Sequence, residues 1–546
     1  MIGRRINLSE RIKITVIEEI DKERADGKES GWEETDRKET VTKENHRKET
    51  VLLHDVGKTL LYTLREGGIK LPSLCGSIGK CGRCQVKFRG QTPLPSQADR
   101  ALIAPDKLRE GYRLACMARP RKNCTVETAF AQEAEIHVVV GSSERNLWKR
   151  DRCGNPCEKK DAAGMDIAVA VDIGTTTIAM QLIQMESGHV LDTYTCMNPQ
   201  RSYGEDVVSR IRAGAGGEGE RLQHLVREAL ATGLGRMLER NGQNRNDREE
   251  TAEDGNPGKP KLMVISANTV MGHLFMGYPV ESLGRSPFLP VNTKTVSLNF
   301  LGIPTVLIPG ISAFVGGDIV SGLYACGLYP AMAATGMPME KAWLFLDLGT
   351  NAEMVIGKGN RIACTAAAAG PAFEGRGKQG KAGSKQIEAI AFLLEKGIAD
   401  REGLLKEPYF ETGIEVELDD KKEKIQIFQQ DIRDIQMAKA AVRAGIYFLM
   451  KKLGIKDDEI ERVYVAGGFG FYLKKKAAVE IGLIPAGLGE KMETVGNTSL
   501  AGAKMIGMKS LLGVCFELEA LTQDAEAFQL ADEPLFEEKY IEYINF

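Results

Sequence analysis

The sequence predicts an α/β protein with a small N-terminal domain and a larger domain of two related lobes. Three observations support this: four cysteines near the N-terminus, a strand–turn–strand pattern that occurs twice, and a Gly-Gly pair after an apolar strand. We expect the small domain at residues 8–130, a connector at 131–165 and the large domain at 166–546. Within the large domain, the lobes are expected at about 166–342 and 343–546.

The cysteine pattern predicts an iron–sulfur site. The segment LPSLCGSIGKCGRCQVKF places Cys75, Cys81 and Cys84 at C-x5-C-x2-C, and GYRLACMARP supplies Cys116. Three thiolates on a glycine-rich loop and one distant thiolate are typical of a [2Fe–2S] cluster. The spacing has one residue more than the plant-type pattern and resembles that of the adrenodoxin-like ferredoxins. The alternative is structural zinc, but zinc sites usually combine two close cysteine pairs, and this segment has one.

The elements around the cysteines follow the order of a β-grasp ferredoxin. Residues 11–18 alternate like a strand, 50–54 form its expected partner, 58–68 predict a helix that ends at glycine, and 85–89 predict a further strand. Residues 21–49 are nearly all polar and cannot bury a core, so we predict a disordered insertion there.

Composition excludes several classes of function. The net charge of −3 over 546 residues gives no broad basic field for nucleic acid. The first residues, MIGRRINLSERIK, have no apolar signal-peptide core, and no long apolar run predicts a membrane span. Eleven cysteines without export indicate ligands and free thiols. We therefore expect a cytoplasmic protein that binds neither nucleic acid nor membrane.

A repeated motif predicts phosphate binding. AVAVDIGTTTIAMQLI (Ala168–Ile183) and WLFLDLGTNAEMVIG (Trp343–Gly357) each place an aspartate, Asp172 or Asp347, and a Gly-Thr turn between two apolar strands. Turn amides and hydroxyls donate to phosphate oxygens, and carboxylates hold Mg²⁺ or orient water. One such turn is ordinary hairpin chemistry, but two favour a nucleotide site. The residues expected to contact phosphate are Gly174, Thr175, Thr176, Gly349, Thr350 and Asn351.

A third element completes the predicted nucleotide site. ERVYVAGGFG (Glu461–Gly470) is a buried strand that ends at Gly467 and Gly468, where a nucleoside can lie against bare backbone. The amphipathic segment before it, Ile432–Leu453, predicts a helix.

These three elements resemble the phosphate-1, phosphate-2 and adenosine motifs of the acetate and sugar kinase, heat-shock chaperone and actin (ASKHA) superfamily. The resemblance implies two related α/β lobes with ATP in the cleft between them. With the ferredoxin-like domain in front, the chain resembles the reductive activators of corrinoid proteins over most of residues 50–546. Four further segments support this: NPQRSYGEDVVSRI (198–211), ANTVMGHLFMG (267–277), AAAAGPAFEG (366–375) and VGNTSLAGAK (495–504).

The resemblance implies a function, cofactors and partners. The chain would reduce inactive Co(II) to Co(I) in a corrinoid protein by one electron from a [2Fe–2S] cluster. This transfer is uphill for clusters near about −400 mV, so ATP would drive it. ATP, Mg²⁺ and the cluster are the implied cofactors, with Asp172 and Asp347 as catalytic carboxylates. The implied partners are a corrinoid protein of a methyltransferase system, a low-potential electron donor, and a second copy in a homodimer.

Three other classes of function are alternatives. A small-molecule kinase with a fused redox domain would need a substrate base that we cannot locate, and it needs no electron donor. An ATP-dependent activator of a non-corrinoid radical enzyme, like the 2-hydroxyacyl-CoA dehydratase activators, would share one [4Fe–4S] cluster between two subunits, which C-x5-C-x2-C does not fit. A plain electron-transfer protein with a degenerate nucleotide fold does not fit the intact Asp172, Asp347 and Gly467-Gly468.

The remaining cysteines have ordinary interpretations. Cys124 is expected to be a packed thiol, and its exchange with Cys116 as a ligand is the alternative. Cys153 and Cys157 form a lone C-x3-C that we interpret as a solvent-exposed pair.

A few polar residues have two interpretations each. His273 lies in an apolar segment and is expected in the core, and Asp318 follows two glycines at either a cleft or a turn. Arg201 and Arg285 are expected to form surface pairs, with contact to phosphate or the corrinoid partner as the alternative.

Overall fold

The structure is a computed structural model. It describes residues 11–19, 38–42, 47–69, 71, 75–128, 166–246, 259–328, 341–373, 383–418, 423–508 and 511–546. The chain divides into two compact units, one of Met1–Glu133 with Pro199–Leu225 and one of Ala134–Asn198 with Val226–Phe546. No helix in these described stretches is both long and apolar enough to cross a bilayer.

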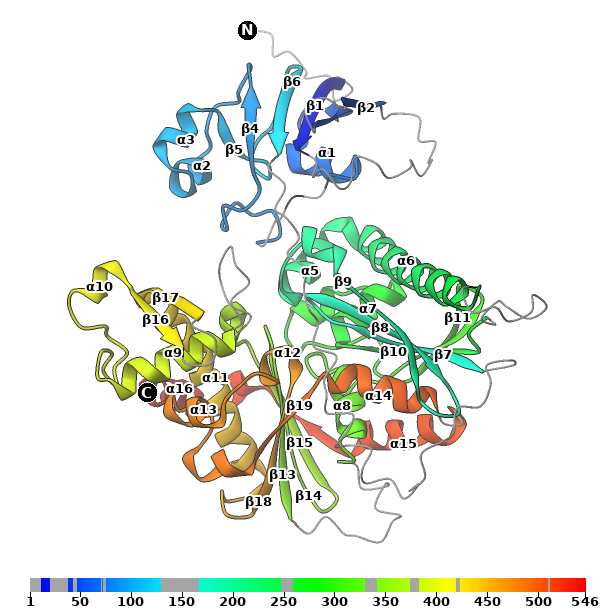
Figure 1. Ribbon diagram of the computed structural model, residues 1–546, viewed down its shortest axis with the longest axis vertical. Helices are drawn as coiled ribbons and strands as arrows, with labels where there is room; N and C mark the ends of the chain where they lie inside the picture. The colour runs from blue at the N-terminus through cyan, green and yellow to red at the C-terminus, as the bar shows by residue number, and fades with distance from the viewer. Residues whose placement is uncertain are drawn as a thin grey trace. The chain divides into compact units, whose positions relative to one another are not determined.

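The first unit contains a six-stranded sheet with the order β2-β3-β1-β6-β4-β5. Its central strand β1 pairs antiparallel with β3 and parallel with β6, and helix α1 (Leu60–Glu66) packs beside β3, which is the β-grasp arrangement (Figure 1). The predicted N-terminal ferredoxin-type fold is therefore confirmed. The strands are β1 (Arg11–Glu19), β2 (Lys38–Thr42), β3 (Arg47–Asp55), β4 (Gln85–Arg89), β5 (Tyr112–Leu114) and β6 (Cys124–Thr128).

Part of the predicted insertion is ordered, which corrects the expectation of disorder over residues 21–49. Strand β2 lies inside this range, and its residues Lys38 to Thr42 pair with Val51 to Arg47 of β3. Composition failed here because an edge strand is held by backbone hydrogen bonds and need not bury apolar side chains. Residues 47–49 at the end of this range belong to β3, and residues 21–37 and 43–46 lie outside the described residues.

The other helices of this unit are short, apart from the first turns of a long helix. They are α2 (Gln97–Leu102), α3 (Pro105–Arg109), η2 (Pro199–Ser202), α5 (Val207–Ala213), η3 (Gly214–Glu218) and the beginning of α6 (Gly219–Asn246). Helix α2 begins with a capping box, in which Ser96 and Asp99 each bind the other's backbone N–H.

The second unit contains two six-stranded sheets with the orders β11-β12-β10-β7-β8-β9 and β19-β18-β13-β14-β15-β20 (Figure 1). The first is made of β7 (Ile167–Ile173), β8 (Thr177–Gln184), β9 (Val190–Met197), β10 (Leu262–Ala267), β11 (Val296–Phe300) and β12 (Ile303–Leu307). The second is made of β13 (Ala342–Leu348), β14 (Ala352–Lys358), β15 (Arg361–Ala367), β18 (Ile460–Ala466), β19 (Met492–Gly496) and β20 (Ala525–Ala527).

The two sheets repeat one topology. Strands β7, β8 and β9 form an antiparallel meander, and β10 and β12 then continue the sheet in parallel from β7. Strands β13, β14 and β15 form the same meander, and β18 and β19 continue in parallel from β13. The motif repeated in the sequence is thus the visible part of a duplicated sheet, and the predicted two-lobed α/β fold is confirmed.

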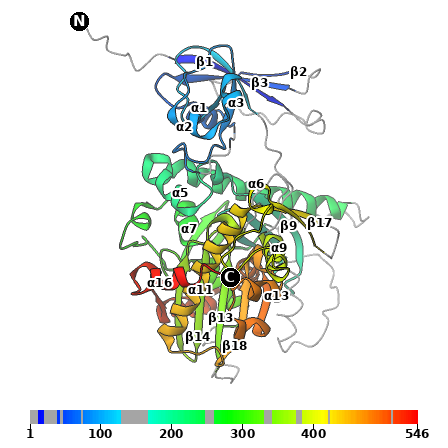
Figure 2. The same ribbon diagram turned by 90° about the vertical axis from the view of Figure 1, so that its left-hand side faces the viewer.

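Helices cover both sheets of this unit. Figure 2 shows α11 alongside β13 and β14, and it packs on β14 and β15. The helices are α7 (Thr269–Met276), α8 (Gly317–Ala325), α9 (Gly383–Glu395), α10 (Tyr409–Thr412), α11 (Gln429–Leu453), α12 (Gly467–Gly470), α13 (Lys475–Glu480), α14 (Thr498–Gly507), α15 (Leu511–Asp524) and α16 (Phe536–Glu542). Four 3₁₀ turns and a hairpin complete it: η4 (Glu281–Gly284), η6 (Gly370–Phe373), η7 (Ala486–Lys491), η8 (Leu530–Asp532), β16 (Ile414–Leu418) and β17 (Glu423–Ile427).

Helix α14 departs from a simple division at residue 342. It follows β19 in the chain, yet it packs against α8 and against β7 and β10 of the other sheet. The Ser321 hydroxyl in the middle of α8 donates to the Ser499 carbonyl in the first turn of α14 at 2.7 Å, which joins the two helices. The C-terminal half of the chain therefore contributes to the surroundings of the first Asp-Gly-Thr turn.

Candidate functional site

The two repeated aspartates lie at corresponding ends of the duplicated sheets. Asp172 is next to last in β7, and Asp347 holds the same place in β13. The preceding strand residues are buried, whereas both aspartates keep a solvent-exposed edge. The charge of Asp172 contributes to the raised pKa of Asp347, so the structure brings the two carboxylates within electrostatic range. The sequence predicted both residues but not their proximity.

Asp172 is held by two side chains from the start of α14. The Ser499 hydroxyl donates to Oδ1 at 2.7 Å, and the Asn497 amide donates to Oδ2 at 2.8 Å. Ser499 Oγ also lies 2.8 Å from Ser266 Oγ on β10. Burial raises the pKa of Asp172, and the two hydrogen bonds oppose this rise. No local sequence pattern signals this clamp, because Asp172 and Ser499 are 327 residues apart.

Asp347 has a different environment. Burial raises its pKa to about 7, and the charge of Asp172 adds to the effect. Among the described residues, no side chain donates a hydrogen bond to the Asp347 carboxylate. Gly467 has a φ of +88°, and a Cβ at this position would lie 2.6 Å from Asp347 Oδ1. The Asp347 carboxylate, which receives no hydrogen bond from a described side chain, therefore lies against the backbone of Gly467, a predicted nucleoside contact.

Two further carboxylates join this group. Asp318 lies in the first turn of α8; burial, followed by the charges of Asp347 and Asp172, raises its pKa to about 8. Glu353 on β14 pairs with Asp347 across the sheet; burial and then the charges of Asp318 and Asp347 raise its pKa well above the usual value. Asp318 therefore lies in a helix, within electrostatic range of Asp172 and Asp347, and does not serve only as a turn residue. Glu353 was missed, although an acid on an otherwise apolar strand was its signal.

Both Gly-Thr turns are closed by backbone hydrogen bonds. The Gly174 N–H donates to the Thr177 carbonyl at 2.9 Å, and the Gly349 N–H donates to the Asn351 carbonyl at 3.0 Å. The first turn has two more supports, both missed in the sequence. The Asn198 amide donates to the Gly174 carbonyl at 2.8 Å, and the Asn268 amide donates to Thr175 Oγ1 at 3.0 Å.

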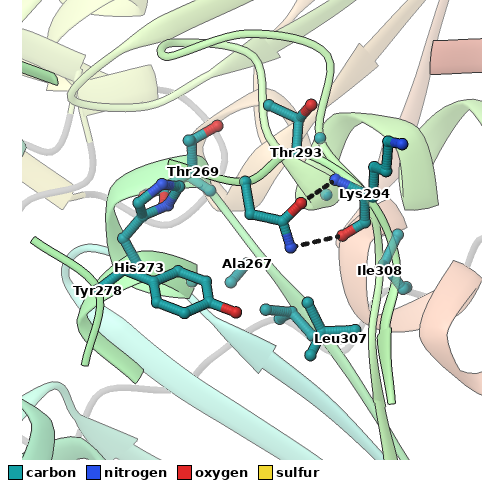
Figure 3. A pocket seen from close by; sticks show the side chains of 14 residues that line it. Ala267, Thr269, His273, Tyr278, Thr293, Lys294, Leu307 and Ile308 are labelled. Carbon is teal, nitrogen blue, oxygen red and sulfur yellow. Dashed lines mark hydrogen bonds between the residues drawn. The ribbon is translucent and has the colours of Figure 1, made fainter. Parts of the chain in front are cut away.

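A small pocket opens at the end of β10, next to the first turn (Figure 3). His273 and Tyr278 line it, with ring centroids 5.6 Å apart and planes nearly perpendicular. The His273 Nδ1–H donates to the Thr269 carbonyl at 2.7 Å, and Nε2 accepts from the Val291 N–H at 3.0 Å. Burial lowers the pKa of His273. Both ring nitrogens are therefore used by the fold, in agreement with the predicted core role.

The four predicted cysteine ligands lie together in the first unit as two pairs. Cys75 lies close to Cys81, and Cys84 lies close to Cys116, because the two thiols of each pair affect each other's pKa. Cys75 and Cys81 are half-buried, whereas Cys84 and Cys116 are buried. The electrostatic influence of Cys75 reaches Cys116, which links the pairs.

The cysteine loop has the backbone that a cluster requires. Gly76, Gly79 and Gly82 have φ values of +63°, +73° and +68°. The Lys80 N–H donates to Cys75 Sγ at 3.4 Å. Within the described residues, no three metal-binding side chains are arranged around a single point. A [2Fe–2S] core has two irons and four cysteines, so two thiol pairs fit it better than they fit one tetrahedral zinc.

The remaining cysteines and the two arginines discussed in the sequence analysis have structural roles, lie exposed at the surface, or lie outside the described residues. Cys124 is buried in β6, and burial raises its pKa to about 11, which agrees with a packed thiol. Arg201 pairs with Glu205 at 2.9 Å, as expected for surface pairing, and Arg285 is exposed. Cys153 and Cys157 lie outside the described residues.

Three family profiles match the chain in succession. Residues 43–121 match a 2Fe-2S iron-sulfur cluster binding domain, and residues 167–331 match the RACo middle region. Residues 341–381 and 377–546 match the C-terminal domain of RACo, the ASKHA domain.

Similar proteins share parts of this organisation. The corrinoid activation enzyme RamQ of Eubacterium limosum is 28% identical over 436 residues, which are 68% of this chain and 69% of that protein. A reductase of Methanosarcina barkeri, specific for the Co(II) methylated amine-specific corrinoid protein, is 29% identical over 36% of this chain and 45% of its own. A component of the Na⁺-translocating NADH-quinone reductase of Chlamydia caviae is 36% identical over 73 residues, 13% of this chain and 17% of its own.

A solved structure shows the same fold over nearly the whole length. It is described as a reductive activator for corrinoid, iron-sulfur protein, with a TM-score of 0.58, 22% identity and 98% of each chain covered. The cluster-binding profile and the two RACo profiles follow one another along a chain that has the corresponding folds. The chain therefore belongs to the family of reductive activators of corrinoid proteins, with an N-terminal [2Fe–2S] ferredoxin-type domain joined to an ASKHA-type domain.

Proposed function

We propose that this protein carries out ATP-dependent reductive activation of a corrinoid protein. One electron reduces inactive Co(II) in the partner to Co(I). The observation that carries the proposal is the presence, on one chain, of a four-cysteine β-grasp domain and a duplicated sheet whose aspartates converge. The names of the relatives from Eubacterium limosum and Methanosarcina barkeri support a corrinoid protein as the acceptor.

The cysteine loop is the proposed electron-carrying site. Cys75 and Cys81 would hold one iron, and Cys84 and Cys116 would hold the other, because the thiols already lie in these pairs. When bound, the cluster supplies a one-electron carrier of low potential. The chain itself supplies the turn geometry and the backbone N–H that stabilises a thiolate at Cys75.

The carboxylate group is the proposed nucleotide site. Asp347 would bind Mg²⁺ or orient the attacking water, since its oxygens have no other donor among the described residues. Asp172, on the other sheet, would be held in place by Asn497 and Ser499 and would shape the site and its electric field. Phosphate and nucleoside would contact the predicted backbone and hydroxyl groups of Gly174, Thr175, Thr176, Gly349, Thr350, Asn351, Gly467 and Gly468.

ATP is proposed to offset an unfavourable redox equilibrium. For one electron, about 59 mV corresponds to a tenfold change in equilibrium. A ligand that binds one conformation more tightly by a few kcal/mol can therefore reverse the direction of transfer. Four crowded carboxylates provide a physical reason why MgATP changes this region, because the cation neutralises charges that otherwise repel one another.

The test is anaerobic absorbance spectroscopy of a corrinoid protein from the same genome, mixed with the reduced protein. We expect Co(I) to form with MgATP and not without it. Equal Co(I) formation without ATP would contradict the proposal, and phosphorylation of a sugar or acid would favour a kinase.

Metal analysis should find two irons per chain. Cys81→Ala should lose the cluster and Cys124→Ala should keep it, which separates ligand from packed thiol.

The proposal includes three assignments that need separate measurements. We propose a homodimer, to be checked by sedimentation, and a cytoplasmic location, to be checked by fractionation of the source cells. We also propose a low-potential protein as the electron donor.

A further inference from the structure

The part of the chain around the cysteines is strongly basic. Residues 75–122 contain eleven Lys and Arg but only three Asp and Glu, although the whole chain has a net charge of −3. The positive excess is therefore a local property of the cluster-binding region, and it has the opposite sign to the chain as a whole.

Two of the three acids in this region already have partners. Asp99 is buried and accepts hydrogen bonds from the Ser96 and Leu114 N–H groups, both at 2.7 Å. Glu110 forms an ion pair with Lys87 at 3.3 Å. In the described part of the chain, no acidic side chain pairs with Lys80 or Arg83, and both are exposed. These two cations thus project into solvent from the loop that carries the predicted ligands.

Two exposed apolar side chains lie beside these cations. Ile78, within the cysteine loop, is 48% exposed, and Leu102, at the end of α2, is 39% exposed. A Cβ at Gly82 would lie 3.5 Å from Leu102 Cβ, so α2 packs directly on the loop. We call Ile78, Lys80, Arg83 and Leu102 the cluster rim. It combines a small apolar contact with unpaired positive charge.

The three rim residues of the loop, Ile78, Lys80 and Arg83, lie next to or between the predicted ligands in sequence. Cys75 and Cys81 flank Ile78 and Lys80 in sequence and are half-buried, whereas Cys84 and Cys116 are buried. Electron-transfer complexes are small and transient, and charge complementarity sets their association rates more than their affinity. A basic rim beside the half-buried ligands Cys75 and Cys81 suits a partner with acidic residues around its own redox centre.

We propose that the cluster rim is the docking surface for the external reductant, a small acidic electron-transfer protein. One electron leaves the reduced centre of the partner and converts one ferric ion of the bound cluster to ferrous. No covalent bond forms or breaks, and no proton moves. This inference deepens the proposed function, because it rests on the bound cluster and names the chemistry of the donor.

The first measurement uses full-length, cluster-loaded protein and flavodoxin hydroquinone, a small acidic flavoprotein, as the probe. Anaerobic stopped-flow absorbance follows reduction of the cluster at increasing salt. We expect the rate constant to fall with salt, because opposite charges attract. The double variant Lys80→Glu with Arg83→Glu should react at least about tenfold more slowly at low salt. The difference should disappear near about 1 M salt, where the Debye length is about 3 Å.

The second measurement does not depend on electron transfer. Calorimetry at low salt should detect binding of oxidised flavodoxin to the wild type and a loss of at least about tenfold in affinity in the rim variant. The matched control is Lys107→Glu with Arg109→Glu, which makes the same change in charge on α3, outside the cysteine loop. The control should stay within about twofold of the wild type in both measurements. Iron content and the visible spectrum establish that all three proteins carry equal amounts of cluster.

Equal effects of the rim and control variants would overturn the proposal, because only net charge would then matter. An unchanged rim variant would overturn it as well. Neither measurement uses ATP or a corrinoid protein, so failure here leaves the proposed function standing, and failure of corrinoid activation leaves this result interpretable.

Discussion

The strands that carry Asp172 and Asp347 share one motif, but the two aspartates have different hydrogen-bond partners. Both strands hold the same place in sheets of the same topology, and both aspartates precede a Gly-Thr turn. Asp172 accepts two hydrogen bonds, from Asn497 and Ser499, whereas the Asp347 carboxylate receives none from the described residues. A duplicated fold has thus produced one clamped carboxylate and one open carboxylate.

The difference indicates a division of labour. A clamped carboxylate has its oxygens occupied and its position fixed, which suits it to shaping the site and its field. An open carboxylate of raised pKa can accept a cation or a proton as the reaction needs. Corresponding positions in the two lobes therefore need not have the same role. Substitutions at and around the two aspartates can test whether their roles differ.

The largest expected effect is on ATP hydrolysis. Asp347→Ala should lower kcat by at least about 100-fold, since a cation- or water-binding group is lost. Asp172→Ala should instead lower the free energy of unfolding by about 1–3 kcal/mol, because Asn497 and Ser499 lose their acceptor. Steady-state ATPase assays and urea unfolding of both variants measure this. Similar kinetic and stability losses in both variants would show that the lobes are equivalent.

The second effect concerns the glycine that faces Asp347. Gly467→Ala forces a side chain into a φ of +88° and against Asp347 Oδ1, so it should cost about 1–3 kcal/mol of stability and about tenfold in ATPase activity. Gly468→Ala is the matched control for stability, because a Cβ there meets nothing within 4 Å. Thermal unfolding without nucleotide compares them. Equal destabilisation by both substitutions would contradict the contact with Asp347.

The third effect is a pH dependence of stability that Mg²⁺ should suppress. The pKa values of Asp347 and Asp318, about 7 and about 8, lie above the ordinary 3.8. The folded state therefore binds more protons than the unfolded state between about pH 4 and pH 8. The stability that these groups contribute is fully present below this window and is lost as the pH rises through it.

Mg²⁺ should compete with these protons. We expect Mg²⁺ to raise the Tm more at pH 8 than at pH 5.5, since the carboxylates are ionised only at the higher pH. Asp318→Asn should flatten the pH dependence in the absence of the metal. A Tm increase that is the same at both pH values would show that the cation binds elsewhere.

How far the sequence predicts this site depends on the range of its contacts. Asp172, Asp347 and Gly467 were found because each follows an apolar strand, and strand and turn chemistry are local properties. Asn497 and Ser499 were not assigned a role, because only the return of α14 to the other sheet brings them to Asp172.

A different limit explains the error in the N-terminal domain. The cysteine spacing predicted one compact site, and the four thiols do lie together. The ordered strand β2 was missed because residues 38–42 pair through their backbone, and a polar composition carries no information about such pairing.

The smallest expected effect tests the clamp itself. Ser499→Ala removes one of the two hydrogen bonds to Asp172, while Asn497 still holds Oδ2 at 2.8 Å. We expect a loss of about 1 kcal/mol in unfolding free energy and an ATPase rate within about threefold of the wild type.

Ser321→Ala is the matched control, because the Ser321 hydroxyl donates to the Ser499 carbonyl at 2.7 Å and does not touch the Asp172 carboxylate. Both variants should lose similar stability, but only Ser499→Ala should change the Mg²⁺ concentration needed for half-maximal ATPase activity. If Ser321→Ala changes that concentration equally, the position of α14 matters and the hydrogen bond to Asp172 does not. In that case the contrast between the clamped and the open aspartate would have no functional consequence.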